Sequence, residues 1–118
     1  MGRALAAACL CVLAALAPAS SQAATPKLVG TVGPGLTISL KIASGAKVTT
    51  LKAGTYSITV RDRSQFHDFR LRGPGVNKVL SGVAAVGTKT VTVRLRAGKY
   101  LFTCQPHTGA MRGSFSVR

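Results

Sequence analysis

The chain has 118 residues, of which 16 are Lys or Arg and only 2 are Asp or Glu, so its formal net charge is +14. A chain of this length accommodates one domain, which leaves no need for a multidomain scheme. The hydrophobic fraction of 47% is too high for a disordered basic tail, and the 13 Gly and 5 Pro between short apolar runs indicate frequent turns. These properties favour a small, turn-rich β domain.

The first 24 residues have the pattern of a secretory signal peptide. Arg3 makes the start positive, residues 4–17 form an unbroken apolar run, and the small residues around Ala23 suit a cleavage site. The run is too short to span a bilayer. We therefore expect cleavage after Ala23 or Ala24, a secreted or periplasmic protein, and one mature domain over residues 25–118. Loss of Arg3 lowers the net charge from +14 to +13.

Alternation of apolar and polar residues dominates the mature chain. It is visible in residues 36–42, 55–60, 90–95 and 114–117, with Gly-containing turns between the runs. A period of two is typical of strands with one buried face, and no segment has a convincing helical period. About seven or eight such strands predict an all-β fold, a Greek-key antiparallel sandwich or barrel.

Residues 51–59 and 95–103 are similar to each other, and each contains Gly-x-Tyr. This pattern resembles a tyrosine corner, in which the hydroxyl of Tyr56 or Tyr100 would bond to backbone upstream. The alternative is a pair of similar hairpin strands. Either interpretation favours a Greek-key topology.

Cys104 is the single cysteine of the mature chain, because Cys9 and Cys11 lie in the predicted signal peptide. It cannot form an internal disulfide. A lone thiol in an oxidising compartment persists if it is buried, if it pairs with another chain or if it binds a metal as thiolate.

Metal-binding residue types crowd the turn between the last two predicted strands, where Cys104, His107 and Met111 follow one another. His67 shares its parity with Phe69 and Leu71 and is expected to point into the core. An inward His at one strand start and an inward Cys at another strand end can meet at the same end of a sandwich. Two imidazoles, a thiolate and a weak axial thioether describe a blue copper electron-transfer site.

Simpler interpretations exist for each residue taken alone. An isolated His67 would more often be structural, and an isolated Met111 would more often fill the core. A nucleophilic Cys104 with His107 as its base fits by residue type, but the sequence offers no motif for oxyanion donors. Because the two histidines and the one mature cysteine all fall in this pattern, we favour copper and expect no enzymatic activity.

The segment Phe-His-Asp-Phe and the terminal Cys-x-x-His-x-x-x-Met, followed by Arg-Gly-Ser-Phe-Ser-Val, resemble the cupredoxins, specifically small exported bacterial proteins of the plastocyanin/azurin type. The resemblance covers nearly all of the mature chain. It implies one copper ion that cycles between Cu(I) and Cu(II). It also implies four copper ligands: His67, Cys104, His107 and, axially, Met111.

Two positions depart from the family pattern. The family commonly has Asn after its first His ligand, where it ties that strand to the Cys loop, whereas this chain has Asp68. An ionised carboxylate accepts hydrogen bonds but does not donate them. The residue after the cysteine is often Ser or Thr in the family and is Gln105 here, so we expect different hydrogen bonds around the metal.

The predicted function is that of an exported type 1 copper protein that transfers single electrons. The alternatives are a copper carrier or buffer and a metal-free cationic β-sandwich that binds the cell envelope. The positive charge predicts an acidic redox partner protein and suits an anionic cell envelope. Nucleic acid is not expected as a partner, because the chain lacks basic-aromatic clusters. We expect a monomer whose electrons pass through His107.

Overall fold

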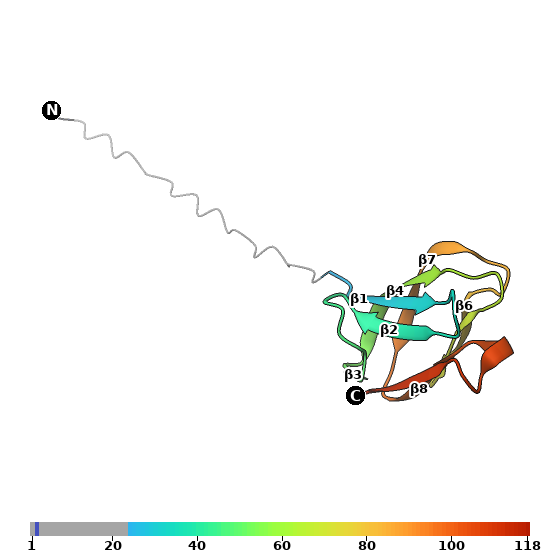
Figure 1. Cartoon of the computed structure of the whole chain (residues 1–118). Helices are drawn as coiled ribbons and strands as arrows, with labels where there is room; N and C mark the ends of the chain where they lie inside the picture. Colours follow the sequence, from blue (N-terminus) through green and yellow to red (C-terminus); the bar gives the residue numbers. More distant parts are fainter. Residues whose placement is uncertain (1, 3–23) are drawn as a thin grey trace.

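The computed structural model of this protein describes residue 2 and residues 24–118 (Figure 1). The predicted signal peptide therefore lies almost wholly outside the described residues, and its cleavage stays a prediction. Among the described residues, no helix is long and apolar enough to cross a membrane.

The described residues form strands and one short 3-10 helix. The strands are β1 (Lys27–Val32), β2 (Ile38–Ile42), β3 (Thr50–Leu51), β4 (Gly54–Asp62), β5 (Phe69–Gly73), β6 (Val76–Ser81), β7 (Gly87–Leu95), β8 (Gly98–Thr103) and β9 (Arg112–Val117). The 3-10 helix η1 (Gln105–His107) lies between β8 and β9. Several strands extend the predicted alternating runs. Others were not predicted, such as β3, because a strand of two residues is too short to show alternation.

The strands form two sheets, in the orders β2-β1-β4-β7 and β3-β9-β8-β5-β6. The prediction of an all-β sandwich is confirmed. Most neighbours are antiparallel, but β1 pairs with β4 and β3 pairs with β9 in parallel, so both sheets are mixed. The first parallel pair arises because the chain leaves β2, passes through β3 in the other sheet and returns as β4 beside β1.

The core lies between the two sheets and is built by the alternation seen in the sequence. In β4, Tyr56, Ile58 and Val60 are buried, whereas their neighbours are half-buried or exposed. Aromatic side chains from the second sheet fill the centre, with the rings of Phe69 and Phe102 stacked at 5.8 Å. Burial of each such side chain contributes about 1.5–3 kcal/mol to stability, so this packing holds the strand ends beside the site in place.

Both tyrosines form tyrosine corners, as their sequence context predicts. The hydroxyl of Tyr100 accepts a hydrogen bond from the Arg96 N–H at 3.1 Å and lies 2.9 Å from the Arg96 carbonyl and 3.0 Å from that of Pro74. The Tyr56 hydroxyl donates to the Lys52 carbonyl at 2.6 Å. These bonds fix the ends of β4 and β8 that lie away from Cys104.

Candidate metal centre

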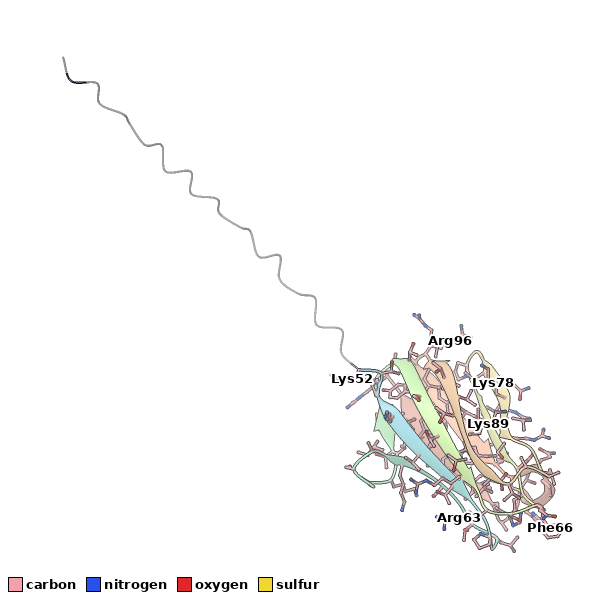
Figure 2. The ribbon with its side chains drawn as sticks, turned by 90° about the horizontal axis from the view of Figure 1, so that it is seen from above. Lys52, Arg63, Phe66, Lys78, Lys89 and Arg96 are labelled. Atoms are coloured by element: carbon pink, nitrogen blue, oxygen red, sulfur yellow. The ribbon has the colours of Figure 1, made fainter. Side chains whose placement is uncertain are left out.

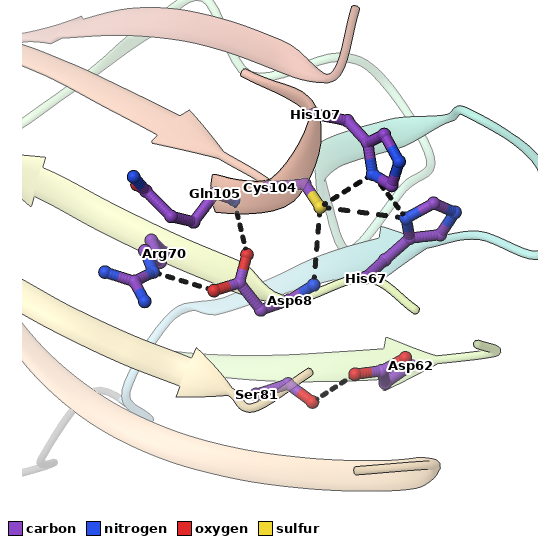
Figure 3. A network of polar contacts seen from close by, with 8 residues as sticks. All are labelled: Asp62, His67, Asp68, Arg70, Ser81, Cys104, Gln105 and His107. Atoms are coloured by element: carbon purple, nitrogen blue, oxygen red, sulfur yellow. Dashed lines mark hydrogen bonds and ion pairs between the residues drawn. The ribbon is translucent and has the colours of Figure 1, made fainter. Parts of the chain in front are cut away.

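Three of the predicted metal-binding side chains, those of His67, Cys104 and His107, come from two connections between strands and point toward one another (Figure 3). His67 lies just before β5, and Cys104 directly follows β8. Phe69 of β5 and Phe102 of β8 anchor these strands in the core. His67 and Cys104 are also buried, with 4% and 0% of their surfaces exposed.

His67, Cys104 and His107 place one donor atom each around a common point. The Cys104 Sγ lies 3.7 Å from the Nδ1 of His67 and 3.7 Å from the Nδ1 of His107, and the two Nδ1 atoms are 3.1 Å apart. First-row metal bonds of about 2.0 Å to imidazole nitrogen and about 2.3 Å to thiolate sulfur place neighbouring donor atoms about 3–4 Å apart. The triangle therefore has the size that one metal ion requires.

The loop between β8 and β9 is closed by its own backbone. The His107 N–H donates to the Cys104 carbonyl at 3.1 Å, the Met111 N–H donates to the His107 carbonyl at 2.8 Å, and the Cys104 N–H donates to the Met111 carbonyl at 3.0 Å. Pro106 lies in η1 and restricts the same turn. Met111 is fully buried and belongs to the hydrophobic core.

The Cys104 thiol is shielded from solvent. Burial raises the pKa of the Cys104 thiol above its ordinary value, and the charge of Asp68 raises it further, while a hydrogen bond from the Asp68 N–H at 3.4 Å opposes both. A catalytic thiol needs exposure and a lowered pKa. A buried thiol with a raised pKa differs from a catalytic cysteine in both respects, and it would lose its proton when a metal ion binds.

Asp68 connects the two halves of the site. Its Oδ1 accepts a hydrogen bond from the Gln105 N–H at 2.6 Å, and its Oδ2 accepts one from the Arg70 Nε at 2.7 Å. Asp68 is 1% exposed, so this carboxylate is held by partners rather than by water. The tie between the His67 strand and the Cys104 loop needs only an acceptor, and the carboxylate supplies it although the position departs from the family's Asn.

Asp62, the other acidic residue of the chain, stabilises the turn that leads into His67. The Oδ1 of Asp62 accepts from the Ser64 N–H at 3.1 Å, and its Oδ2 accepts from the Ser81 hydroxyl at 2.5 Å. Gly33 passes beside this turn with a left-handed φ of 73°. A Cβ atom there would lie 2.8 Å from the Ser64 Cβ and 3.2 Å from the His67 ring. Only glycine fits this close approach, which holds the imidazole from the side of β1.

Sequence reasoning missed the roles of Asp62 and Arg70 in positioning the site. A signal was available, because a chain with 16 basic residues has only two acidic ones, and these two flank the His67 segment. A carboxylate that persists in such a composition at the end of a strand is a candidate for a buried hydrogen-bonding role.

The donor set fits copper. A thiolate and imidazoles suit both Cu(I) and Cu(II), and His67, Cys104 and His107 are the group of described residues arranged to hold a metal ion. Of the four ligands predicted from the sequence, the donor atoms of His67, Cys104 and His107 converge. The backbone of Met111 is bonded to the backbones of Cys104 and His107, and the axial role of its side chain stays a prediction.

Comparison with known proteins also indicates a copper-binding protein. Residues 36–118 match the family described as copper binding proteins, plastocyanin/azurin family. A rusticyanin variant matches with 25% identity and a TM-score of 0.54, covering 78% of this chain and 76% of the other. Rusticyanin from Thiobacillus ferrooxidans matches with 24% identity and a TM-score of 0.52, over 78% and 76% of the two chains. A comparison with curated protein sequences finds no match.

The family match covers well over half of the chain, and the His-Cys-His cluster has the composition of a blue copper site. Together they identify a protein that holds one copper ion and carries electrons. The chain belongs to the plastocyanin/azurin family of copper-binding proteins and is a cupredoxin.

Proposed function

We propose that this protein is an exported, secreted or periplasmic, electron carrier whose single copper is bound by His67, Cys104, His107 and, axially, Met111. The observation that carries the proposal is the convergence of the Cys104 Sγ with two imidazole Nδ1 atoms at 3.7 Å each. Copper supplies a one-electron couple between Cu(I) and Cu(II) when it is bound. No enzymatic activity is proposed.

The chain's own contribution is a largely buried set of donors held by hydrogen bonds. Backbone hydrogen bonds close the Cys104 loop, and the Asp68 carboxylate ties that loop to the His67 strand. The Asp68 N–H points at the Cys104 Sγ and stabilises negative charge on sulfur. Because the donors are held by packing and hydrogen bonds, they need to move little when the metal charge changes.

His107 is the proposed exit for the electron. Its Nδ1 faces Cys104, while the residue as a whole is only half-buried, so the far ring edge approaches the surface. The neighbouring Pro106, Gly109 and Ala110 are exposed. This edge offers a short path between the site and a docked redox protein.

The surface charge supports an acidic redox partner. The two acidic residues of the chain, Asp62 and Asp68, are both buried, so its exposed charged side chains are basic. Basic residues such as Lys52, Lys78 and Lys89 project from several parts of the domain (Figure 2). Such a field attracts acidic proteins and an anionic cell envelope, and we propose no nucleic-acid partner. We propose that the protein acts as a monomer.

The first test is the visible spectrum of the purified protein with one equivalent of Cu(II). The protein should become intensely coloured through charge transfer from thiolate to copper. Cys104→Ser should remove the colour, and His67→Ala should weaken copper binding. Gln105→Ala is a matched control, because this exposed side chain lies in the same loop and should leave the colour unchanged. Colour that persists in Cys104→Ser would refute the thiolate ligand.

A second test separates electron transfer from copper delivery. The loaded protein is oxidised and reduced repeatedly, and its copper content is measured after each cycle. An electron carrier retains its copper through rapid cycles. A copper carrier or buffer would instead lose the ion to a competing acceptor while its redox turnover remained slow. The metal-free envelope protein is the least supported alternative, because the chain matches a copper-binding family.

A further inference from the structure

A small pocket with three arginines lies beside the metal centre, on the outer face of the five-stranded sheet. Arg70, Arg72 and Arg112 line it, together with Thr103 and Thr108. Its volume is about 120 Å³. Pockets for drug-sized organic ligands measure about 300–1,000 Å³, so this one suits only a small ion or group.

The strand register explains why the arginines meet. Arg70 of β5 is opposite Thr103 of β8, and Thr103 is opposite Arg112 of β9, so the three residues form a row across the sheet. Arg72 lies two residues along β5 on the same face. Side chains directly opposite each other in a sheet have Cβ atoms about 4.5–5.5 Å apart. Two arginines therefore flank one threonine in this row, and a third arginine lines the same pocket.

This concentration of positive charge has little internal compensation. Among the described residues, the ion pair that involves these arginines is that of Arg70 with Asp68 at 2.7 Å. It uses the Arg70 Nε and leaves the terminal amino groups of that guanidinium for another partner. The other acidic residue, Asp62, is buried in its network with Ser64 and Ser81. Strand β8 separates Arg112 from the two arginines of β5, and an anion in the pocket between them would be attracted by all three positive charges.

We propose that this pocket binds a free tetrahedral oxyanion of the phosphate or sulfate class. The planar guanidinium group of arginine can donate two parallel hydrogen bonds to the oxygens of such an anion. The hydroxyls of Thr103 and Thr108 offer additional donors. The inference rests on the fold and the charge of the pocket and does not depend on copper. A failure to bind copper would therefore leave it standing.

The pocket is linked to the metal centre through Arg70. The same Arg70 side chain is bonded to Asp68, which accepts a hydrogen bond from the Gln105 N–H in the Cys104 loop. Thr103, which lines the pocket, directly precedes Cys104. Oxyanion binding should therefore alter the environment of the backbone amides of Thr103 and Gln105.

The experiment is a titration with sodium sulfate and, separately, with sodium phosphate, followed by amide NMR signals at low ionic strength. It is performed on both the Cu(I)-loaded and the metal-free protein, with sodium chloride at matched ionic strength as the reference. Sulfate and phosphate should each shift the signals of Thr103, Gln105 and Arg112 in a saturable way, and chloride should not. Arg112→Gln should weaken binding about tenfold, because one charged hydrogen-bonding group is lost.

Arg94→Gln is the matched control. Arg94 is an exposed arginine on β7 of the other sheet, so this variant removes the same charge elsewhere. Equal weakening by Arg94→Gln and Arg112→Gln would mean diffuse attraction and overturn the proposal, as would the absence of saturable shifts. Vesicles of phosphatidylglycerol form a further arm. If they bind through Arg112 while neither free sulfate nor free phosphate does, the ligand is a lipid phosphate and the assignment to a free oxyanion is wrong.

Discussion

The carboxylate of Asp68 accepts a 2.6 Å hydrogen bond from the backbone N–H of Gln105, and this bond joins the two connections that carry the metal-binding side chains. The backbone N–H of the same aspartate points at the Cys104 Sγ. One residue thus positions the His67 strand, the Cys104 loop and the sulfur. Because Asp68 is buried, its charge also acts on the site with little solvent screening.

Replacement of Asp68 should separate its hydrogen bond from its charge. Asp68→Ala removes the acceptor of the Gln105 N–H and should lower the free energy of unfolding by about 1–3 kcal/mol, since a part-buried donor loses its partner. Asp68→Asn can keep that bond and should destabilise less. The loss of a buried negative charge should raise the reduction potential of Asp68→Asn, because Cu(II) loses more stabilisation than Cu(I). Denaturant unfolding and voltammetry measure the two effects. An unchanged potential would indicate that Arg70 fully neutralises the carboxylate.

Met111→Gln should lower the reduction potential while copper stays bound. A long thioether bond contributes little to holding the metal, but it favours Cu(I), whereas an amide oxygen is a harder ligand that favours Cu(II). Copper content and the potential are measured on the same sample. If the potential is unchanged, Met111 serves only as core packing.

Binding of a metal ion at the copper site should release a proton from the Cys104 thiol. Burial raises the pKa of this thiol, so at neutral pH the metal-free protein holds it protonated, and binding must displace the proton. Below the thiol pKa, the affinity for a redox-inert ion such as Zn²⁺ should rise about tenfold for each unit of pH from this group alone. Calorimetry in buffers of different ionisation enthalpy counts the proton. Cys104→Ser should release about one proton fewer, and equal release in both proteins would contradict the assignment.

The raised pKa of Cys104 also sets a direction for the stability of the metal-free protein. A thiol whose pKa is higher in the folded state than in the unfolded state favours folding while it is protonated. This contribution is complete below the unfolded pKa and is lost as the pH rises through the folded pKa. Denaturant unfolding of metal-free protein should therefore show a loss of stability in alkaline solution that is smaller in Cys104→Ser.

The two tyrosine corners should differ in their contributions to stability. Tyr100→Phe removes a fully buried hydroxyl that contacts three backbone groups, and it should cost about 1–3 kcal/mol. Tyr56→Phe removes one bond to the Lys52 carbonyl and should cost about 0.5–1.5 kcal/mol. The visible spectrum of the copper form should be unchanged in both variants, because the corners lie at the other ends of the strands. Equal losses would show that the three contacts of the Tyr100 hydroxyl contribute no more than the one bond of the Tyr56 hydroxyl.

Electron transfer to an anionic oxidant should slow as salt is added. The exposed charged side chains are basic, and screening shortens their reach to about 10 Å at 0.1 M ionic strength. Stopped-flow rates with a negatively charged small oxidant are compared with those of a neutral one over a range of ionic strength. If both oxidants respond alike, the positive field does not act at the His107 surface.

Local pattern in the sequence was sufficient to predict the all-β fold and the alternating runs that form β2, β4, β7 and β9, and it suggested the tyrosine corners. It also indicated His67, Cys104 and His107 as candidate metal ligands. A strand alternates its side chains between two faces whatever its partner, so the parity of Tyr100, Phe102 and Cys104 already indicated burial. The same parity placed His67 inward. These predictions required no knowledge of which strands are neighbours.

Tertiary structure decided everything that depends on strand pairing. Pairing joins residues far apart in the chain, and a period of two does not specify the partner strand or its direction. The parallel pairs of β1 with β4 and of β3 with β9 were therefore not predictable from alternation. For the same reason, only the folded chain brought Asp68 to Gln105 and aligned Arg70 with Thr103 and Arg112, because each of these contacts is set by the register between separate strands.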